Sequence, residues 1–392
     1  MNIMKKRVAV FFGGKSVEHE VSVITGHQVM ENMDTDKYEV IPVFIDKDGK
    51  WYTGESLKDF NNFKNRKLED LVEVTMNPVY GDCKLYTHHN KLKKLGKNFT
   101  QEIDIIFPAM HGTHGEDGTL MGLFELIGIP YVGCNVTSSS VGMDKILMKS
   151  VFKAEGLPVV NYTWFYRKRW QLESDKLVSE IEEKIGYPVI VKPANLGSSI
   201  GISKATDRAS LIKAIDVAAS YDRKILVEEA IQNLREINCA VIGNDDIVEA
   251  SLCEEPIGWS EIQTFADKYM KGSKSAKGGK GGNDKHQIPA NIDEAVAREI
   301  RDLAQKSFIA LDCAGTARID FLLGDNTKVY VNEINTLPGS LSFHIWKASG
   351  LEFKPLITKL IELAEQVNKE KVANMYTYDV DLYNNMNKGG TK

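Results

Sequence analysis

Two acidic residues and an asparagine near the C-terminus have a spacing that suits a divalent metal ion. The segment "RIDFLLGDNTKVYVNEIN" contains two strand-like runs joined by the turn-forming residues GDNT, which predicts a hairpin. With the turn centred between Asn326 and Thr327, Asp320 lies opposite Glu333. Asn335 projects from the same face as Glu333, because side chains alternate along a strand. Opposed carboxylates repel unless a cation lies between them, and with an amide oxygen they suit Mg²⁺. The alternative is a chance register with both acids solvated.

A second group of residues could bind phosphate. In "VIVKPANLGSSIGIS", Lys192 ends an apolar strand, and Ser198 and Ser199 belong to a glycine-containing loop before the next strand. Backbone N–H groups and serine hydroxyls can surround phosphate oxygens while the lysine supplies a positive charge. A loop that merely connects two strands is the alternative. Arg318, on the same side of its strand as Asp320, would add positive charge where negative charge develops.

The N-terminal loop imitates two nucleotide-binding motifs and satisfies neither. The strand-like run "RVAVFF" leads into Gly13-Gly14-Lys15-Ser16, but a P-loop requires a glycine where this chain has Ala9. A dinucleotide fingerprint requires three spaced glycines, which argues against a NAD-dependent enzyme. The role of this loop therefore has to come from the rest of the chain.

The loop "PAMHGTHGEDGTLMG" gathers two histidines and two acids after the strand-like run "IDIIFPAM". His111 and His114 suggest zinc, yet the spacing lacks the helix and the base of a metalloprotease motif. A substrate-positioning loop at the C-terminal end of a sheet strand is the preferred interpretation.

The composition is that of an ordinary globular protein, with 43% hydrophobic and 26% charged residues. The formal net charge of -5 provides no overall excess of positive charge for binding nucleic acid. No apolar run is long enough to cross a membrane, and no signal-peptide pattern precedes the first strand. Five scattered cysteines without a CxxC pair indicate reduced thiols used in packing. These features predict a cytoplasmic protein that binds neither nucleic acid nor membrane.

The alternation of strand-like and helical runs predicts an α/β fold of several domains. We expect an N-terminal α/β domain with a largely parallel sheet over 1–135, a central lobe over 136–225 and a C-terminal lobe over 226–370. One helix with a serine cap should begin the central lobe, and "KILVEEAI" should open the C-terminal lobe. The Lys/Gly-rich loop 265–290 is either a solvated insertion or a lid, and the tail 371–392 should be weakly ordered.

Eight motifs in order resemble the D-alanine–D-alanine ligase family of ATP-grasp enzymes. They are "FFGGKSVEHEVS", "HGTHGEDGTLMG", "VGMDK", "VIVKPANLGSSIGIS", "LVEEAI" with Glu236, "ADKY", "ARIDFLL" and "NEINTLPG". The resemblance extends over roughly residues 7–370. It implies a three-domain ATP-grasp fold, in which an N-terminal parallel-sheet domain is joined to two lobes that enclose ATP. It also implies ligation of two D-alanines through an acyl phosphate for peptidoglycan synthesis, with ATP and Mg²⁺ (or Mn²⁺) as cofactors and a homodimer as the assembly.

The resemblance also implies roles for individual residues. Those that would contact ATP are Lys145, Lys192, Ser198, Ser199, the hinge residues Glu228, Glu229 and Ile231, the ribose-binding Glu236, and Lys268. Asp320, Glu333 and Asn335 match the metal ligands. Those that would bind the first amino acid or act in catalysis are Glu18, His111, Ser198, Tyr269, Arg318 and Gly339, the last two at the oxyanion. An acyl phosphate hydrolyses readily, so water must be excluded from the site. The resemblance therefore favours the interpretation of the Lys/Gly-rich loop as a lid.

One segment departs from the family pattern. After "NEINTLPG" this chain continues with "SLSFHIW", where the family serine that binds the second substrate's carboxylate aligns with His344. Ser342 or His344 could replace that serine, so D-serine, D-lactate or another amino acid are alternative second substrates. Tyr269 follows the dipeptide-forming pattern. A nucleotide-binding regulatory protein that has lost ligation is the alternative from another functional class.

Overall fold

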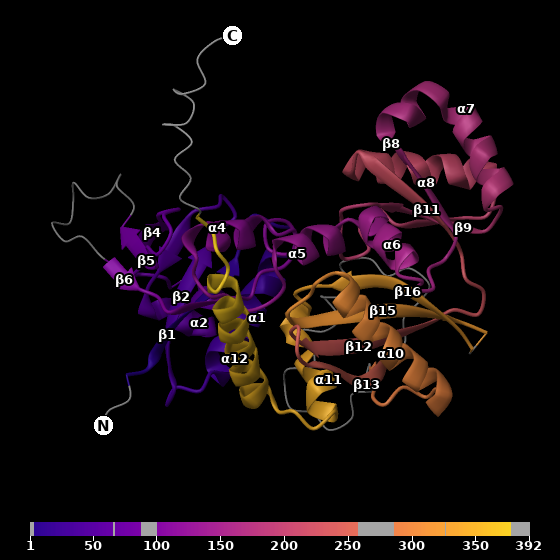
Figure 1. Cartoon of the computed structure of the whole chain (residues 1–392). Coiled ribbons are helices and arrows are strands. Elements are labelled where there is room, and N and C mark those ends of the chain that lie inside the picture. Colours follow the sequence, from indigo (N-terminus) through magenta and orange to yellow (C-terminus); the bar gives the residue numbers. More distant parts are fainter. Residues whose placement is uncertain (1–3, 66, 88–99, 258–285, 326, 378–392) are drawn as a thin grey trace, which may run out of the picture.

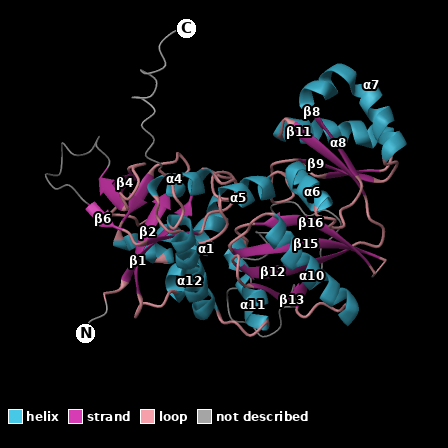
Figure 2. Cartoon of the chain, in the orientation of Figure 1, coloured by secondary structure: helices cyan, strands magenta, loops and turns pink. Residues whose placement is uncertain are grey.

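In the computed structural model the chain folds around three β-sheets (Figures 1 and 2). The structure describes residues 4–65, 67–87, 100–257, 286–325 and 327–377. Lys268, Tyr269 and most of the predicted lid loop lie outside these residues, as does the predicted tail beyond residue 377. Among the described helices, none combines the length and the apolar character needed to cross a bilayer.

The first sheet has seven strands in the order β6-β5-β4-β3-β2-β1-β7. Its parallel part consists of β1 (Lys6–Gly13), β2 (Tyr38–Ile45) and β7 (Ile105–Pro108). The apolar run of β1 is buried on both faces, as expected for a central parallel strand. The remaining strands pair in antiparallel fashion: β3 (Trp51–Thr53), β4 (Val72–Met76), β5 (Lys84–Thr87) and β6 (Thr100–Glu102). The prediction of a largely parallel sheet was therefore wrong for this edge, which begins at β3 because the short connection from β2 permits only antiparallel pairing.

Helices from both ends of the chain pack on this first sheet. They are α1 (His19–Asn32), α4 (Thr119–Ile127) and the C-terminal α12 (Phe353–Val372), with the short η1 (Glu55–Lys58) and α2 (Phe60–Asn65) nearby. Helix α12, yellow in Figure 1, returns beside α1, and its apolar face joins the same hydrophobic core. It remains helical to Val372, slightly beyond the start of the predicted tail.

The second sheet is antiparallel, in the order β10-β9-β11-β8. Its strands are β8 (Tyr162–Tyr166), β9 (Val189–Pro193), β10 (Ser203–Ala205) and β11 (Lys224–Glu229), and α7 (Arg167–Lys184) and α8 (Arg208–Tyr221) pack on it. The run "KILVEE" was expected to open the next lobe. Instead it forms β11, which pairs with β8 and β9, because its apolar residues complete this sheet's core.

The third sheet has the order β14-β13-β12-β15-β16 and is also antiparallel. It consists of β12 (Arg235–Gly243), β13 (Val248–Pro256), β14 (His286–Gln287), β15 (Gly315–Gly324) and β16 (Lys328–Asn335). Helix α10 (Glu294–Ala310) covers it with the apolar residues that form a second core. The turn η4 (Gly339–Ser342) and helix α11 (Phe343–Ala348) follow β16.

Two helices connect the first sheet to the other two, where one helix was predicted. They are α5 (Val136–Met143) and α6 (Lys145–Ala154). The chain is extended at Asp144, whose carboxylate accepts hydrogen bonds from the first backbone N–H groups of α6. The caps are Asn135 and Asp144, so the serine-cap prediction was wrong. All five cysteines are free thiols, four of them buried, in agreement with the packing interpretation.

Candidate active site

The acidic hairpin has the predicted register at the residues that were expected to bind a metal ion. Asp320 of β15 pairs with Glu333 of β16, and Arg318 pairs with Asn335. Toward the turn the register shifts by one residue, so that Phe321 pairs with Val331. Asn332 is the extra residue of a β-bulge, which the residue pattern did not reveal.

The bulge gives Asn332 contacts with two lysines from other elements. Its side-chain oxygen accepts a hydrogen bond from Lys192 Nζ of β9 at 3.2 Å, and its backbone carbonyl accepts one from Lys149 Nζ of α6 at 3.1 Å. The bulge therefore links the hairpin to the second sheet.

Arg318 and Asp320 form a paired arrangement on one face of β15. The guanidinium donates through Nε to Asp320 Oδ1 at 2.6 Å and through Nη2 to Oδ2 at 2.8 Å. Burial opposes the charge of Arg318, but the charge of Asp320 and its hydrogen bonds outweigh this and raise the pKa of the guanidinium. Arg318 therefore keeps a fixed positive charge beside the carboxylates.

The donor set of the hairpin suits a hard divalent cation. The side-chain nitrogen of Asn335 donates a hydrogen bond to Asp320 Oδ2 at 3.0 Å. The side-chain oxygen of Asn335, the atom that would bind the metal, takes no part in that bond. Lys145 Nζ lies 3.4 Å from Glu333 Oε2 and also donates to the carbonyl of Leu196 at 3.0 Å. Two carboxylates and an amide oxygen on one strand pair are oxygen ligands of the kind that bind Mg²⁺ together with water and phosphate oxygens.

Three charged residues form a buried cluster between β9, β11 and α6. Glu228 Oε2 lies 2.6 Å from Lys192 Nζ, and Glu228 Oε1 lies 2.9 Å from Lys149 Nζ. Burial would raise the pKa of Glu228, but the two ammonium groups lower it to about 2. Glu228 thus carries a permanent negative charge at neutral pH. Lys149 was not among the predicted site residues, and its helical, apolar surroundings in the sequence conceal it.

A first cavity lies between the second and third sheets. The predicted site residues that line it are Lys145, Lys192, Ser198, Ser199, Glu228, Glu229, Ile231, Glu236, Arg318, Asp320 and Glu333. Ser198 and Ser199 have φ angles of 54° and 57°, in the left-handed region that non-glycine residues rarely adopt. Such a strained loop beside two lysines is consistent with binding of phosphate groups.

A second cavity adjoins the first and extends toward the N-terminal sheet. The predicted residues that line it are Glu18, His111, Lys145, Ser198, Arg318, Glu333, Asn335 and Gly339. Glu18 immediately precedes α1 and accepts a hydrogen bond from Ser198 Oγ, which joins the N-terminal loop to the serine loop. His111 Nε2 lies 2.8 Å from Thr25 Oγ1, and burial lowers the pKa of this imidazole to about 4. His111 is therefore neutral at pH 7.

Glu116 also lines the second cavity, although it was noticed only as part of the glycine-rich loop. Its Oε2 accepts a hydrogen bond from the backbone N–H of Gly112 at 2.7 Å. Removal from water and the nearby charge of Glu18 raise the pKa of Glu116 to about 8. The signal in the sequence that could have identified Glu116 as a site residue was its position within "HGTHGEDG".

Two predicted substrate residues are placed away from both cavities. Ser342 is fully buried, and its Oγ has no hydrogen-bond partner among the described residues. His344 Nε2 lies 2.7 Å from Glu254 Oε1. Neither residue lines the first or the second cavity, whereas Gly339, at the start of η4, lines the second.

The comparisons with known proteins agree with this architecture. Residues 7–134 match the family model "D-ala D-ala ligase N-terminus" and residues 151–362 match "D-ala D-ala ligase C-terminus". A D-alanine–D-alanine ligase of Acetivibrio thermocellus is 44% identical, over 96% of this chain and 99% of that protein. One from Thermosipho africanus is 40% identical, over 96% of this chain and 98% of that protein.

Solved structures show the same fold. The D-alanine–D-alanine ligase of Coxiella burnetii superposes with a TM-score of 0.78 at 32% identity, covering 95% of this chain and 97% of that one. The VanG D-Ala:D-Ser ligase of Enterococcus faecalis has a TM-score of 0.74 at 31% identity, covering 92% and 100%. The three sheets and the cavity between two of them thus define an ATP-grasp protein. Within that class, the chain belongs to the D-alanine–D-alanine ligase family.

Proposed function

We propose that this protein uses ATP to join two D-alanines into D-alanyl-D-alanine in the cytoplasm, for peptidoglycan precursor synthesis. The observation that carries the proposal is the meeting of two lysines, an arginine and the acidic hairpin in one cavity, next to a second cavity lined by Glu18, His111 and Gly339. Family membership supports it, because the curated relatives named above are D-alanine–D-alanine ligases.

In the proposed reaction the first cavity holds ATP. Lys145, Lys192 and the Ser198–Ser199 loop would contact the phosphates, with Glu228, Glu229, Ile231 and Glu236 along the nucleoside. Asp320, Glu333 and Asn335 would hold Mg²⁺ or Mn²⁺, which neutralises phosphoryl charge when bound. Arg318 lies beside this ligand set, so its charge can act on the transferring group as well as on the carbonyl.

The second cavity would hold the amino acids. Glu18 would receive the ammonium group of the first D-alanine, which is supported by its position in the lining of this cavity together with neutral His111. The carboxylate of this D-alanine attacks the γ-phosphorus, the bond to the bridging oxygen breaks, and ADP leaves. The amine of the second D-alanine, once deprotonated, then attacks the acyl carbon and expels phosphate. Arg318 and the backbone N–H of Gly339 would stabilise the oxyanion formed in that step.

A different second substrate is the main alternative. His344 aligns with the family's carboxylate-binding serine and Ser342 lies two residues earlier, yet both lie outside the two cavities. A structural relative of this chain is a D-Ala:D-Ser ligase. D-Serine, D-lactate and other amino acids therefore belong in the test.

The test measures ATP-dependent phosphate release with D-alanine alone and with D-alanine paired with D-serine or D-lactate, followed by mass analysis of the products. D-Alanyl-D-alanine as the dominant product is expected. A mixed product from the paired substrates would favour the alternative. ATP binding without release of phosphate for any substrate would point to a regulatory nucleotide-binding protein. Sedimentation of the purified protein will test the proposed homodimer.

A further inference from the structure

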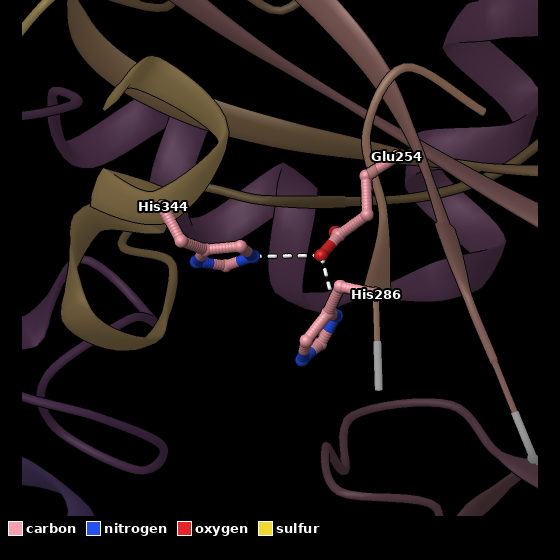
Figure 3. A group of neighbouring side chains, drawn as sticks. All are labelled: Glu254, His286 and His344. Carbon is pink, nitrogen blue, oxygen red and sulfur yellow. Dashed lines mark hydrogen bonds and ion pairs between the residues drawn. The ribbon is translucent and has the colours of Figure 1, made fainter. Parts of the chain in front are cut away.

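Three side chains outside both cavities converge on one point of the third sheet (Figure 3). They are Glu254 of β13, His286 of β14 and His344 of α11. His286 Nδ1 lies 2.6 Å and His344 Nε2 lies 2.7 Å from the same oxygen, Glu254 Oε1. The two rings are 5.0 Å apart between centroids. Both imidazole nitrogens therefore face the same carboxylate oxygen, and the three atoms lie close together.

The carboxylate of this cluster is held in place by its surroundings. The side chain of Glu254 is only 2% exposed, and its second oxygen accepts a hydrogen bond from Asn238 Nδ2 at 3.0 Å. That bond fixes the orientation of the carboxylate while Oε1 faces the histidines. An outer partner that orients a ligating side chain is a regular feature of protein metal sites.

The pairing of β13 with β14 brings the first histidine to Glu254. Pro256 pairs with His286 and Glu255 pairs with Gln287, so β14 runs along the end of β13. His344 comes from the first turn of α11, a separate part of the chain. Three elements thus supply one donor each, and both histidines are partly exposed while Glu254 is buried.

We propose that Glu254, His286 and His344 bind one divalent transition-metal ion, with Zn²⁺ as the preferred ion. Imidazole nitrogen and carboxylate oxygen are ligands for Zn²⁺, whereas Mg²⁺ takes oxygen donors. The three donor atoms all lie within 4.8 Å of one another. A tetrahedral ion with bonds of about 2.1 Å keeps its ligands about 3.4 Å apart, so small side-chain adjustments complete the site.

The proposed site is separate from the Mg²⁺ ligands of the hairpin and goes beyond the proposed ligase function. Three protein ligands leave the fourth position of a tetrahedral ion to water on the exposed side of the histidines. A bound ion would tether β13, β14 and α11 to one another. Because it binds the folded state, it should raise the thermal unfolding temperature.

The experiment measures metal binding by the full-length chain without ATP or amino acids. Protein stripped of metal with a chelator is titrated with Co²⁺, followed by its visible absorption, and then with Zn²⁺ by equilibrium dialysis. We expect one equivalent of tightly bound Zn²⁺ that displaces Co²⁺ and raises the unfolding temperature. Loss of an outer-shell partner alone typically weakens a site about 10- to 100-fold. His286→Gln and His344→Gln should each lose at least that much affinity.

The control is His114→Gln, which removes an exposed histidine from another part of the fold. It should bind Zn²⁺ like the natural protein. Glu254→Gln, which keeps the shape of the side chain, should lose binding, and metal-free unfolding temperatures will verify that each variant is folded. Equal Zn²⁺ affinity in the two histidine variants and the natural protein would overturn the proposal. Absence of any stoichiometric binding would also overturn it and leave only a hydrogen-bonded group. Neither result depends on ligase activity, which is assayed separately by product formation.

Discussion

Lys192 and Glu228 form a buried ion pair between neighbouring strands, with 2.6 Å between Nζ and Oε2. Lys149 Nζ binds the other oxygen of the same carboxylate at 2.9 Å. One negative charge is therefore shared by two lysines at the inner wall of the first cavity. This arrangement holds Lys192, the expected phosphate contact, in position.

Replacement of Glu228 by glutamine should destabilise the protein strongly, because it leaves two buried ammonium groups without their partner. Breaking a buried pair on one side costs about 3–5 kcal/mol. Urea unfolding at pH 7 will measure this change. Glu183→Gln, on the exposed side of α7, is the matched control and should change the free energy of unfolding little. Equal stability of the two variants would contradict the structural role of the ion pair.

The same carboxylate should make stability depend on pH in the acid range. The pKa of Glu228 falls from its ordinary value of 4.5 to about 2 in the folded protein. In this pH range the folded state therefore binds fewer protons than the unfolded state. The stability that Glu228 contributes is fully present above pH 4.5 and is lost as the pH falls toward 2. Unfolding measured between pH 6 and about 2.5 should show a smaller loss for Glu228→Gln than for the natural protein. Parallel curves for the two proteins would refute the assignment.

Glu116 should have the opposite effect. Its pKa is raised to about 8, so the folded protein holds a proton that the unfolded chain releases from about 4.5 upward. Stability should therefore decline as the pH rises from 4.5 to 8. Glu116→Gln, which remains neutral, should flatten this decline in thermal unfolding scans. The interpretation fails if the variant retains the full slope.

Glu333→Gln should severely reduce ligation while leaving the fold intact. The change removes one of two opposed carboxylates, and loss of one preorganised electrostatic contact typically costs about 10²–10³ in turnover. Phosphate release at saturating ATP and Mg²⁺ will measure it, and circular dichroism will verify folding. Glu299→Gln on the exposed face of α10 serves as control. Near-normal turnover of Glu333→Gln would rule out its role as a metal ligand.

Arg318→Lys should also be severely impaired, although it keeps the positive charge. A lysine cannot reproduce the two parallel hydrogen bonds to Asp320, and its charge would lie elsewhere. We expect a fall of about 10²-fold or more in turnover with a smaller change in the KM for ATP. The exposed Arg298→Lys provides the comparison. Unchanged turnover in Arg318→Lys would show that the two parallel hydrogen bonds from Arg318 to Asp320 are dispensable.

Much of the site could be predicted because its signals are local. The hairpin "RIDFLLGDNTKVYVNEIN" places Asp320 opposite Glu333 through strand alternation and a turn, and the structure has that pair. The agreement depends on the bulge at Asn332, since the register beyond it differs by one residue. A bulge changes pairing without a residue pattern of its own, so only the folded structure reveals it.

Other features depend on contacts between distant parts of the chain. Strand β11 joined the second sheet because its apolar side chains complete that core, and α12 returned to the first sheet for the same reason. The charge of Glu228 and the proton on Glu116 arise from burial and from neighbours far away in sequence. Residue types and spacing determined the family and the opposition of Asp320 and Glu333, because those follow from the order of motifs and from short-range geometry. Tertiary structure decided which side chains meet, as with Glu254, His286 and His344, because burial and long-range contacts exist only in the folded chain.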